Sequence, residues 1–289
     1  MVKIQKQGAF WAILFGLLVM LSGCVSLEDA DGLYRQGNND KALDVAIEFL
    51  ADSDPLVRVQ AANLVGKIGG ERAALALVPL LKDTEQPVVL AGIKAMGQTG
   101  FGPIGEVLAE QVPGAHGPVF DALAKAFNKL GTVGIDFLVA AYDGGSSDVD
   151  TKAYRAMLIQ IGPGVSVSIA NSFKGRSAEA NESKLAILVE LRSPSVPALL
   201  IDMIADPEVA QMVVRSLIQL GSMSVDPAIR KLTELKDSDE GALVKELLCR
   251  ALGDIKSRRA IPILEAMAKD SSDLVRATAD GALVKVRGF

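Results

Sequence analysis

The fold of this chain is decided by the stretch Asp54-Pro55-Leu56-Val57-Arg58-Val59-Gln60-Ala61-Ala62-Asn63-Leu64-Val65-Gly66-Lys67-Ile68-Gly69-Gly70. Asp54 before Pro55 is the pairing of a helix N-cap with proline at the first helical position. Apolar residues then recur at helical spacing, at Val57, Ala61, Leu64 and Ile68. Gly69 follows the last of them, and glycine there ends a helix because it adopts the left-handed conformation without penalty. The stretch therefore predicts one helix that closes in a turn.

This helix end recurs with a period of about 31 residues. The recurring positions are Gly69, Gly100, Gly131 and Gly162, followed by Arg192, Gly221, Gly253 and a looser copy at Gly288. First helices are expected at about 85–99, 117–130, 148–161, 179–191, 207–220, 239–252 and 271–286. A second helix follows each turn, at about 71–82, 102–112, 132–143, 164–174, 195–205, 224–236 and 258–269. Self-similarity at such a period is typical of helical solenoids.

The stretch Asp54 to Ala62 resembles the HEAT-repeat family, in the short bacterial form that is also found in phycobilin lyases. Ser272-Asp273-Leu274-Val275-Arg276-Ala277-Thr278-Ala279 is a second match, and residues 259–270 resemble the second helix of the family. The middle repeats lack the Val-Arg pair and are supported by their spacing. The resemblance implies an all-α fold, a right-handed α-solenoid of about seven HEAT-like helix pairs over residues 54–289. Second helices usually line the concave binding surface of such arrays.

Residues 24–53 differ from the repeats that follow them. Leu33 to Leu43 is similar to a tetratricopeptide-type turn between two helices. One such pair is too little for an array of its own, because a repeat needs neighbours to bury its apolar face. We interpret residues 24–53 as an N-terminal helical cap.

The first 24 residues have the organisation of an export signal. Lys3 and Lys6 precede the apolar run from Gly8 to Met20, which ends in Leu21-Ser22-Gly23-Cys24. These four residues resemble the bacterial lipobox, which implies that a signal peptide of residues 1–23 is removed and that Cys24 carries diacylglycerol and a further fatty acid such as palmitate. An uncleaved membrane helix or an ordinary signal with a chance cysteine is the alternative, but the 15 residues from Gly8 to Ser22 fall short of the ~20 that span a bilayer.

Composition limits the partners of the chain. Lys3 and Lys6 are the only charged residues before Cys24, so the processed chain would carry 28 basic and 35 acidic residues, a net charge of −7. This charge argues against nucleic acid, which needs a basic face. Val25 follows the cysteine, whereas Asp at that place in proteobacterial lipoproteins often signals inner-membrane retention. The resemblance thus favours the periplasmic face of the outer membrane. The second cysteine, Cys249, lies in a helical pattern and is expected to be a buried thiol.

Catalytic or metal-binding patterns are scarce in the sequence. The single histidine, His116, falls in a loop between helices, where an exposed side chain is favoured over a ligand or general base. The acidic segment 143–150 lacks the residue order of a calcium loop and is better explained by a solvated turn with helix N-caps. Glycine-rich segments join helix to helix without the Lys-Ser/Thr of a phosphate loop. We therefore predict no catalytic residue, metal or cofactor, and no enzyme.

Charge is unevenly distributed along the predicted repeats. Residues 101–150 have a net charge of −5, and residues 151–200 have a net charge of +3. Four acids on predicted second helices are candidate contacts for a partner: Glu106, Glu110, Asp136 and Asp143. Ordinary solvated helix faces explain these residues equally well.

The function that follows is a membrane-anchored protein-binding scaffold in the bacterial cell envelope, with a protein or peptide as its partner. Two alternatives stay open: an enzyme related to the HEAT-repeat lyases, and a purely structural envelope spacer. Export disfavours the lyase, because pigment attachment takes place in the cytoplasm.

Overall fold

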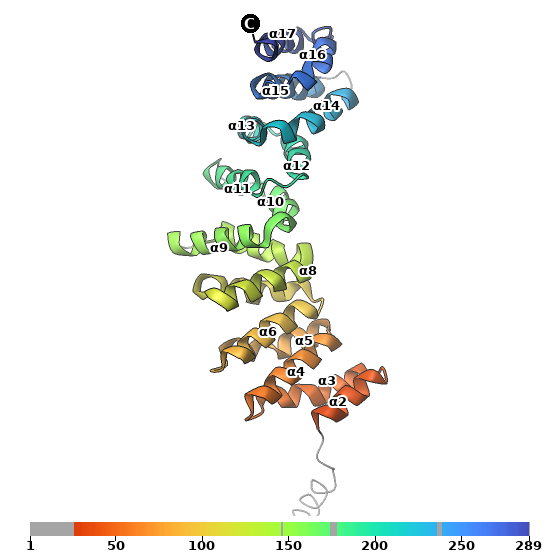
Figure 1. Cartoon of the computed structure of the whole chain (residues 1–289), viewed down its shortest axis with the longest axis vertical. Helices are drawn as coiled ribbons and strands as arrows, with labels where there is room; N and C mark the ends of the chain where they lie inside the picture. Colours follow the sequence, from red (N-terminus) through yellow and green to blue (C-terminus); the bar gives the residue numbers. More distant parts are fainter. Residues whose placement is uncertain (1–25, 146, 174–177, 236–238, 289) are drawn as a thin grey trace, which may run out of the picture. The chain divides into compact units, whose positions relative to one another are not determined.

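The computed structural model describes residues 26–145, 147–173, 178–235 and 239–288, and all regular elements in these ranges are helices (Figure 1). The signal segment 1–23, Cys24 and Val25 lie outside the described residues. The chain divides into two compact units, Met1–Ile104 and Gly105–Phe289, which we treat one at a time. None of the helices in the described ranges is long and apolar enough to cross a membrane.

The first unit consists of helices joined by short turns. They are α2 (Leu27–Arg35), α3 (Asn39–Glu48), η1 (Phe49–Ala51), α4 (Pro55–Ile68), α5 (Gly70–Ala76), η2 (Val78–Lys82), α6 (Gln86–Gln98) and η3 (Gly102–Ile104). Ser26 begins α2 with a capping box, because its hydroxyl accepts from the Asp29 amide while the Asp29 carboxylate accepts from the Ser26 amide. Asp54 caps α4 as predicted, accepting a hydrogen bond of 2.8 Å from the Leu56 amide.

The two first helices of this unit, α4 and α6, approach each other at backbone distance. A Cβ atom added to Gly66 would lie 2.8 Å from the Cα atom of Ala95, which is closer than real Cβ atoms come to a neighbour. Both helices therefore use their smallest side chains at the contact. The core around it is aliphatic, with Ala61, Val65 and Ala95 fully buried.

The second unit continues the alternation of first and second helices. Its elements are α7 (Gly105–Ala109), η4 (Val112–Gly114), α8 (Gly117–Asp143), α9 (Asp148–Ile161), η5 (Gly162–Val165), α10 (Ser166–Asn171), α11 (Ala178–Leu191), α12 (Val196–Met203), α13 (Ala210–Leu220), η6 (Gly221–Ser224), α14 (Val225–Glu234), α15 (Asp239–Ile255), η7 (Arg258–Ala260), α16 (Ile261–Met267) and α17 (Asp273–Arg287). Helix α8 contains a first and a second helix that meet at Gly131, whose φ of 66° and ψ of −155° are not helical.

Contacts within the second unit run from neighbour to neighbour. Each of the first helices α9, α11, α13 and α15 packs on the first helix before it and on the one after it, and the series ends with α17 packed on α15. The second helices α10, α12, α14 and α16 form a parallel series of contacts of the same kind. This pattern, in which each repeat completes its core with its neighbours, is that of a solenoid-like helical repeat fold.

These observations confirm the predicted all-α fold of HEAT-like helix pairs. Left-handed backbone occurs at the expected glycines, and Arg192 adopts it in place of glycine with φ of 46°. The helix end predicted at Gly253 is wrong: α15 continues to Ile255, and the left-handed residue is Lys256, with φ of 56°. Gly253 packs instead, because a Cβ atom on it would lie 2.7 Å from the Cβ atom of Ala282.

Candidate binding face on the second helices

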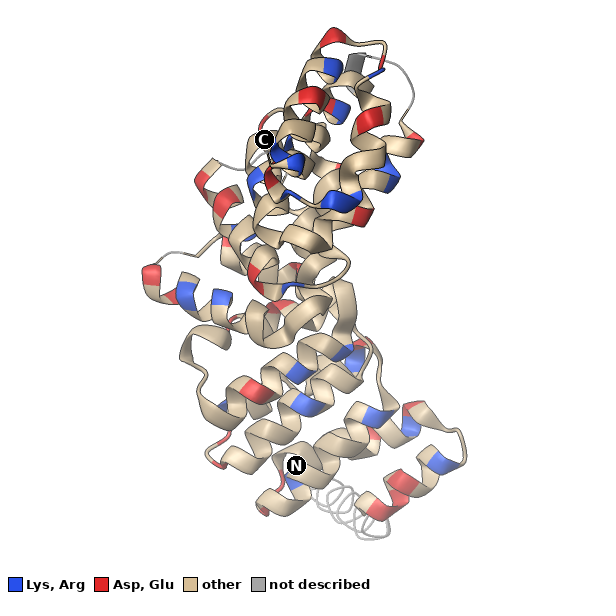
Figure 2. Cartoon of the chain, turned by 45° about the horizontal axis from the view of Figure 1, so that its top comes forward, with Lys and Arg blue, Asp and Glu red and all other residues tan. Residues whose placement is uncertain are grey.

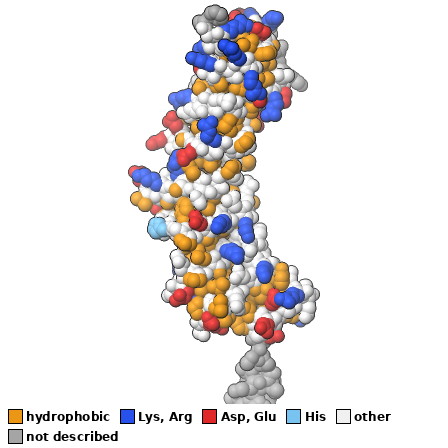
Figure 3. Space-filling view, in the orientation of Figure 1, with side chains coloured by type: hydrophobic (Ala, Val, Ile, Leu, Met, Phe, Trp, Pro, Cys, Tyr) orange, Lys and Arg blue, Asp and Glu red, His pale blue; other side chains and the backbone are white. Residues whose placement is uncertain are grey.

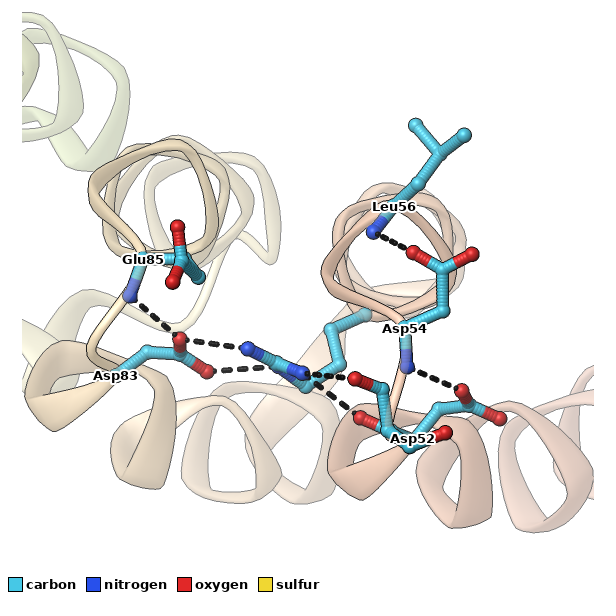
Figure 4. A network of polar contacts seen from close by, with 7 residues as sticks. Asp52, Asp54, Leu56, Asp83 and Glu85 are labelled. Atoms are coloured by element: carbon cyan, nitrogen blue, oxygen red, sulfur yellow. Dashed lines mark hydrogen bonds and ion pairs between the residues drawn. The ribbon is translucent and has the colours of Figure 1, made fainter.

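The arginine of the Val57-Arg58 pair joins neighbouring repeats. Arg58 donates two hydrogen bonds of 2.8 Å to the Asp83 carboxylate and one of 2.8 Å to the Asp52 carbonyl (Figure 4). The Arg58 guanidinium thereby holds the pKa of Asp83 below its ordinary value. Because Asp52 lies in the loop before α4 and Asp83 lies in the loop before α6, the motif arginine has a structural role and is not available to a ligand.

The last repeats contain the same arrangement with a lysine. Lys245 donates a hydrogen bond of 2.8 Å to Asp270, and both side chains are almost fully buried. Arg276 donates to the carbonyls of Asp270 and Ser271, as Arg58 does to the loop before α4. Arg58 and Lys245 thus occupy equivalent places, each 25 residues before its aspartate.

Three of the four candidate acids are exposed on second helices of the second unit. Glu106 lies on α7, Glu110 follows it directly, and Asp136 lies in the second half of α8. The two helices touch at their glycines, since a Cβ atom on Gly105 would lie 2.7 Å from the Cα atom of Gly134. This contact places Glu106 and Asp136 on adjacent second helices.

The fourth candidate, Asp143, is buried and ion-paired. Its side chain is 3 % exposed, and its carboxylate oxygens lie 3.2 and 3.3 Å from the Nζ atom of Lys184, which is fully buried. The same ammonium group donates to the carbonyl and hydroxyl oxygens of Ser172 at 2.8 and 3.0 Å. It also lies 5.1 Å from the centre of the Phe173 ring. The Asp143 carboxylate is therefore largely neutralised within the fold.

A pocket of about 350 Å³ brings two of the four acids together. It lies between the last turns of α8 and α10, and its lining residues are Asp136, Val139, Ala140, Asp143, Ser168, Asn171 and Ser172. Glu106 and Glu110 do not line it. The polar groups of the pocket are carboxylate, hydroxyl and amide groups, so the wall offers mainly oxygen acceptors.

Lys184 is the residue of this region that the sequence reasoning missed. It lies eight residues before the left-handed Arg192. In four other repeats the place eight residues before the left-handed residue holds a buried apolar side chain, namely Ala61, Leu123, Val213 and Leu248, whereas before Gly288 it holds the exposed Asp280. A lysine at a repeat position that is otherwise often apolar was the sequence feature that could have predicted the buried ion pair between Lys184 and Asp143.

The other residues considered in the sequence analysis lie at helix starts or in the core. His116 is exposed and precedes α8 as its N-cap residue, without a side-chain cap bond. In the acidic segment, Ser147 caps α9 by accepting from the Asp150 amide at 3.1 Å. Within the described ranges, no group of three or more His, Cys, Asp or Glu residues could hold a metal ion. Cys249 is fully buried, and burial raises its pKa to about 12.

Surface charge and surface apolar groups are dispersed. Figure 2 shows acidic and basic residues mixed along α15 to α17, where pairs such as Lys285 with Asp254 lie 2.7 Å apart. On the face shown in Figure 3, hydrophobic side chains are interrupted by charged ones. Among the exposed large hydrophobic residues of the described ranges, Val149 has the highest exposed fraction, and it lies at the start of α9. The second-helix acids are therefore the better guide to a binding face.

Helix pairs, left-handed helix ends and neighbour-to-neighbour packing define an α-helical repeat protein of the solenoid class. The HEAT repeats family matches residues 30–97 and 185–284, which together make up more than half of the sequence. The chain belongs to the HEAT-repeat family. The first match begins inside α2, so it includes most of the helix pair that we interpreted as a cap.

Several solved structures match the chain at low sequence identity and low TM-score. Human deoxyhypusine hydroxylase in complex with glycerol is 18% identical, with a TM-score of 0.29 over 86% of this chain and 85% of that chain. The complex of CpcE and CpcF of phycocyanin lyase from Nostoc sp. PCC7120 is 18% identical, with a TM-score of 0.32 over 84% of this chain and 94% of that chain. A mutant of Kap121p is 13% identical, with a TM-score of 0.40 over 86% of this chain and 33% of that chain. At these identities and TM-scores, the three proteins say nothing about the activity of this chain.

No curated protein sequence matches the chain.

Proposed function

We propose that this protein is an exported lipoprotein whose HEAT repeats serve as a protein-binding scaffold in the bacterial cell envelope. The HEAT-repeat fold fits a protein-binding solenoid, because stacked helix pairs present an extended surface that no single repeat could form. The observation that carries the proposal is the series of second helices in the second unit, with the exposed acids Glu106, Glu110 and Asp136.

The anchor is the second part of the proposal. The lipobox-like Leu21-Ser22-Gly23-Cys24 and the apolar run before it support lipid attachment at Cys24. Several acyl chains on one residue hold a protein firmly, whereas a single chain binds a membrane only marginally. Val25 supports the outer membrane, on its periplasmic face, as the location. Cys24→Ser should abolish membrane attachment, measured by fractionation and detergent-phase partitioning, and normal processing with unchanged partitioning would contradict the anchor.

An enzyme related to the HEAT-repeat lyases and a purely structural spacer are the alternatives. No observation on the described residues favours catalysis, since the one histidine is exposed at a helix start and Cys249 is buried. A spacer would have no preferred contact on its second helices. A search for partner contacts on the second helices therefore distinguishes a scaffold from a spacer.

Site-specific photocrosslinking in the native envelope supplies this test. A photoreactive side chain replaces Val133, which is 52% exposed in the second half of α8, so that Asp136 stays in place. Glu182, which is 69% exposed on the first helix α11, is the matched control position. We expect one discrete crosslinked protein from position 133 and none from position 182. Equal crosslinking from both positions, or none from either, would leave the spacer as the better explanation.

A further inference from the structure

We propose that the pocket between α8 and α10 receives one basic side chain, lysine or arginine, of the partner protein. This inference rests on the proposed scaffold function and adds the chemistry that the scaffold recognises. Asp136 supplies the principal charge, because it is exposed and no ion pair with it occurs among the described residues.

The formal charge of the pocket region is negative after its internal pairing is counted. Asp136 and Asp143 contribute two carboxylates, and the buried Lys184 behind the wall neutralises Asp143. Among the described residues that line the pocket, this leaves one negative charge, on the exposed side chain of Asp136. The pocket also lies at the carboxyl end of α8, where the carbonyl dipoles of a helix favour a cation.

A second observation points to a polar ligand. Ser168 lines the pocket and is 2% exposed, and its hydroxyl group, which can accept or donate, has no hydrogen-bond partner among the described residues. A buried hydroxyl without a partner is destabilising, and such groups in native proteins usually have an explanation. An N–H donor that enters the pocket can supply the missing hydrogen bond. The neighbouring Asn171 is exposed and offers a further amide oxygen.

The groups that line the pocket distinguish an organic cation from a metal ion. Calcium takes six to eight oxygen ligands, commonly with several carboxylates. Here one of the two carboxylates is already paired with Lys184, and no group in the described ranges meets the requirement for a metal cluster. A volume of about 350 Å³ accommodates one long side chain. An ammonium or guanidinium group therefore fits the pocket better than a metal ion does.

The experiment uses methyl NMR of the full chain in detergent micelles, with Val139 of the pocket wall as the reporter. The probes are N-acetyl-arginine amide and its uncharged isostere N-acetyl-citrulline amide. We expect saturable shifts of the Val139 methyl signals with the arginine probe, and at least tenfold weaker binding of the citrulline probe. Equal binding of both probes, or an unmoved Val139, would overturn the inference.

Two variants and one ion complete the design. Asp136→Asn should weaken binding of the arginine probe by about tenfold, because a charge-assisted hydrogen bond is lost. Glu182→Gln, on the first helix α11 and outside the pocket, should leave the affinity unchanged. Calcium chloride that moves Val139 at lower concentration than the arginine probe would assign the pocket to a metal ion and refute the inference.

These experiments test the pocket inference and the scaffold proposal independently of each other. If a partner crosslinks to position 133 but the arginine probe does not shift the Val139 signals, the inference of a basic side chain is refuted and the scaffold proposal stands. Binding of the arginine probe without any crosslinked partner would refute the scaffold and leave the pocket standing.

Discussion

Removing the carboxylate of the buried pair between Asp143 and Lys184 should destabilise the second unit strongly. In Asp143→Ala, the fully buried ammonium group of Lys184 loses the carboxylate that lies 3.2 Å away. Breaking a buried pair from one side costs about 3–5 kcal/mol, because the other charge stays uncompensated. We expect a loss of this size in the free energy of unfolding.

Replacing both partners should restore most of that loss. The double variant Lys184→Leu with Asp143→Val places leucine where the equivalent positions of other repeats hold Leu123 and Leu248. Apolar replacement of a buried pair is commonly neutral or stabilising by about 1–4 kcal/mol. We therefore expect the double variant to be about as stable as the unmodified protein or more stable.

Urea unfolding followed by circular dichroism measures both effects. The comparison uses the midpoint and slope of each variant, since repeat proteins can unfold in more than one transition. A loss below about 1 kcal/mol in Asp143→Ala would refute the claim that the pair is desolvated. A double variant as unstable as the single one would show instead that packing at α8 and α11, and not the unpaired charge, explains the loss.

Three further predictions concern the repeats. Arg192→Gly should stabilise the protein by about 0.5–1 kcal/mol, because the left-handed backbone strains every residue except glycine; an unchanged or lower urea midpoint would contradict this. Gly66→Ala should destabilise the protein by about 1–3 kcal/mol, because the new methyl group would overpack against α6. As the control, Gly32→Ala should be neutral or slightly stabilising, since nothing lies within 4 Å of its new Cβ atom. Equal thermal midpoints for both variants would refute the close contact at Gly66. For Asp270, burial raises the pKa, but hydrogen bonds from Lys245 and the backbone outweigh it and keep the pKa below the ordinary 3.8. Its contribution to stability is therefore present above about pH 4 and is lost as the pH falls through the folded-state value. The stability difference between the unmodified protein and Asp270→Asn should narrow below pH 4, and a constant difference would count against the prediction.

Sequence patterns predict the helices of this chain well because their signals are local. The N-cap at Asp54 and the left-handed Gly69 act within one turn of the helices that they bound. At Gly253 the same reasoning failed, because glycine serves two purposes in this fold. Glycine ends a helix at Gly69, whereas at Gly66 it allows two helices to pack closely. Which role a glycine has depends on whether another helix contacts it, as Ala95 contacts Gly66, and the local sequence does not show this.

The candidate site was predicted only in part. Acids on second helices were visible from the repeat period, and three of them are exposed as surface charge requires. The burial of Asp143 was not visible, since its partner Lys184 lies 41 residues further on and on a different helix. Pairing over such a distance depends on how repeats stack, which no local pattern reports.

The neighbour-to-neighbour packing of the second unit gives it an unusual response to mechanical force. Because the helices of a pair, such as α15 and α16, pack on each other and on the neighbouring pairs, removing a terminal pair leaves the contacts among the remaining pairs in place. A pull on the ends should therefore unravel the unit in steps of one helix pair, each releasing about 31 residues or roughly 100 Å of extended chain. Under this model the unit extends in small steps under force, and helix pairs can refold one at a time when the force is released.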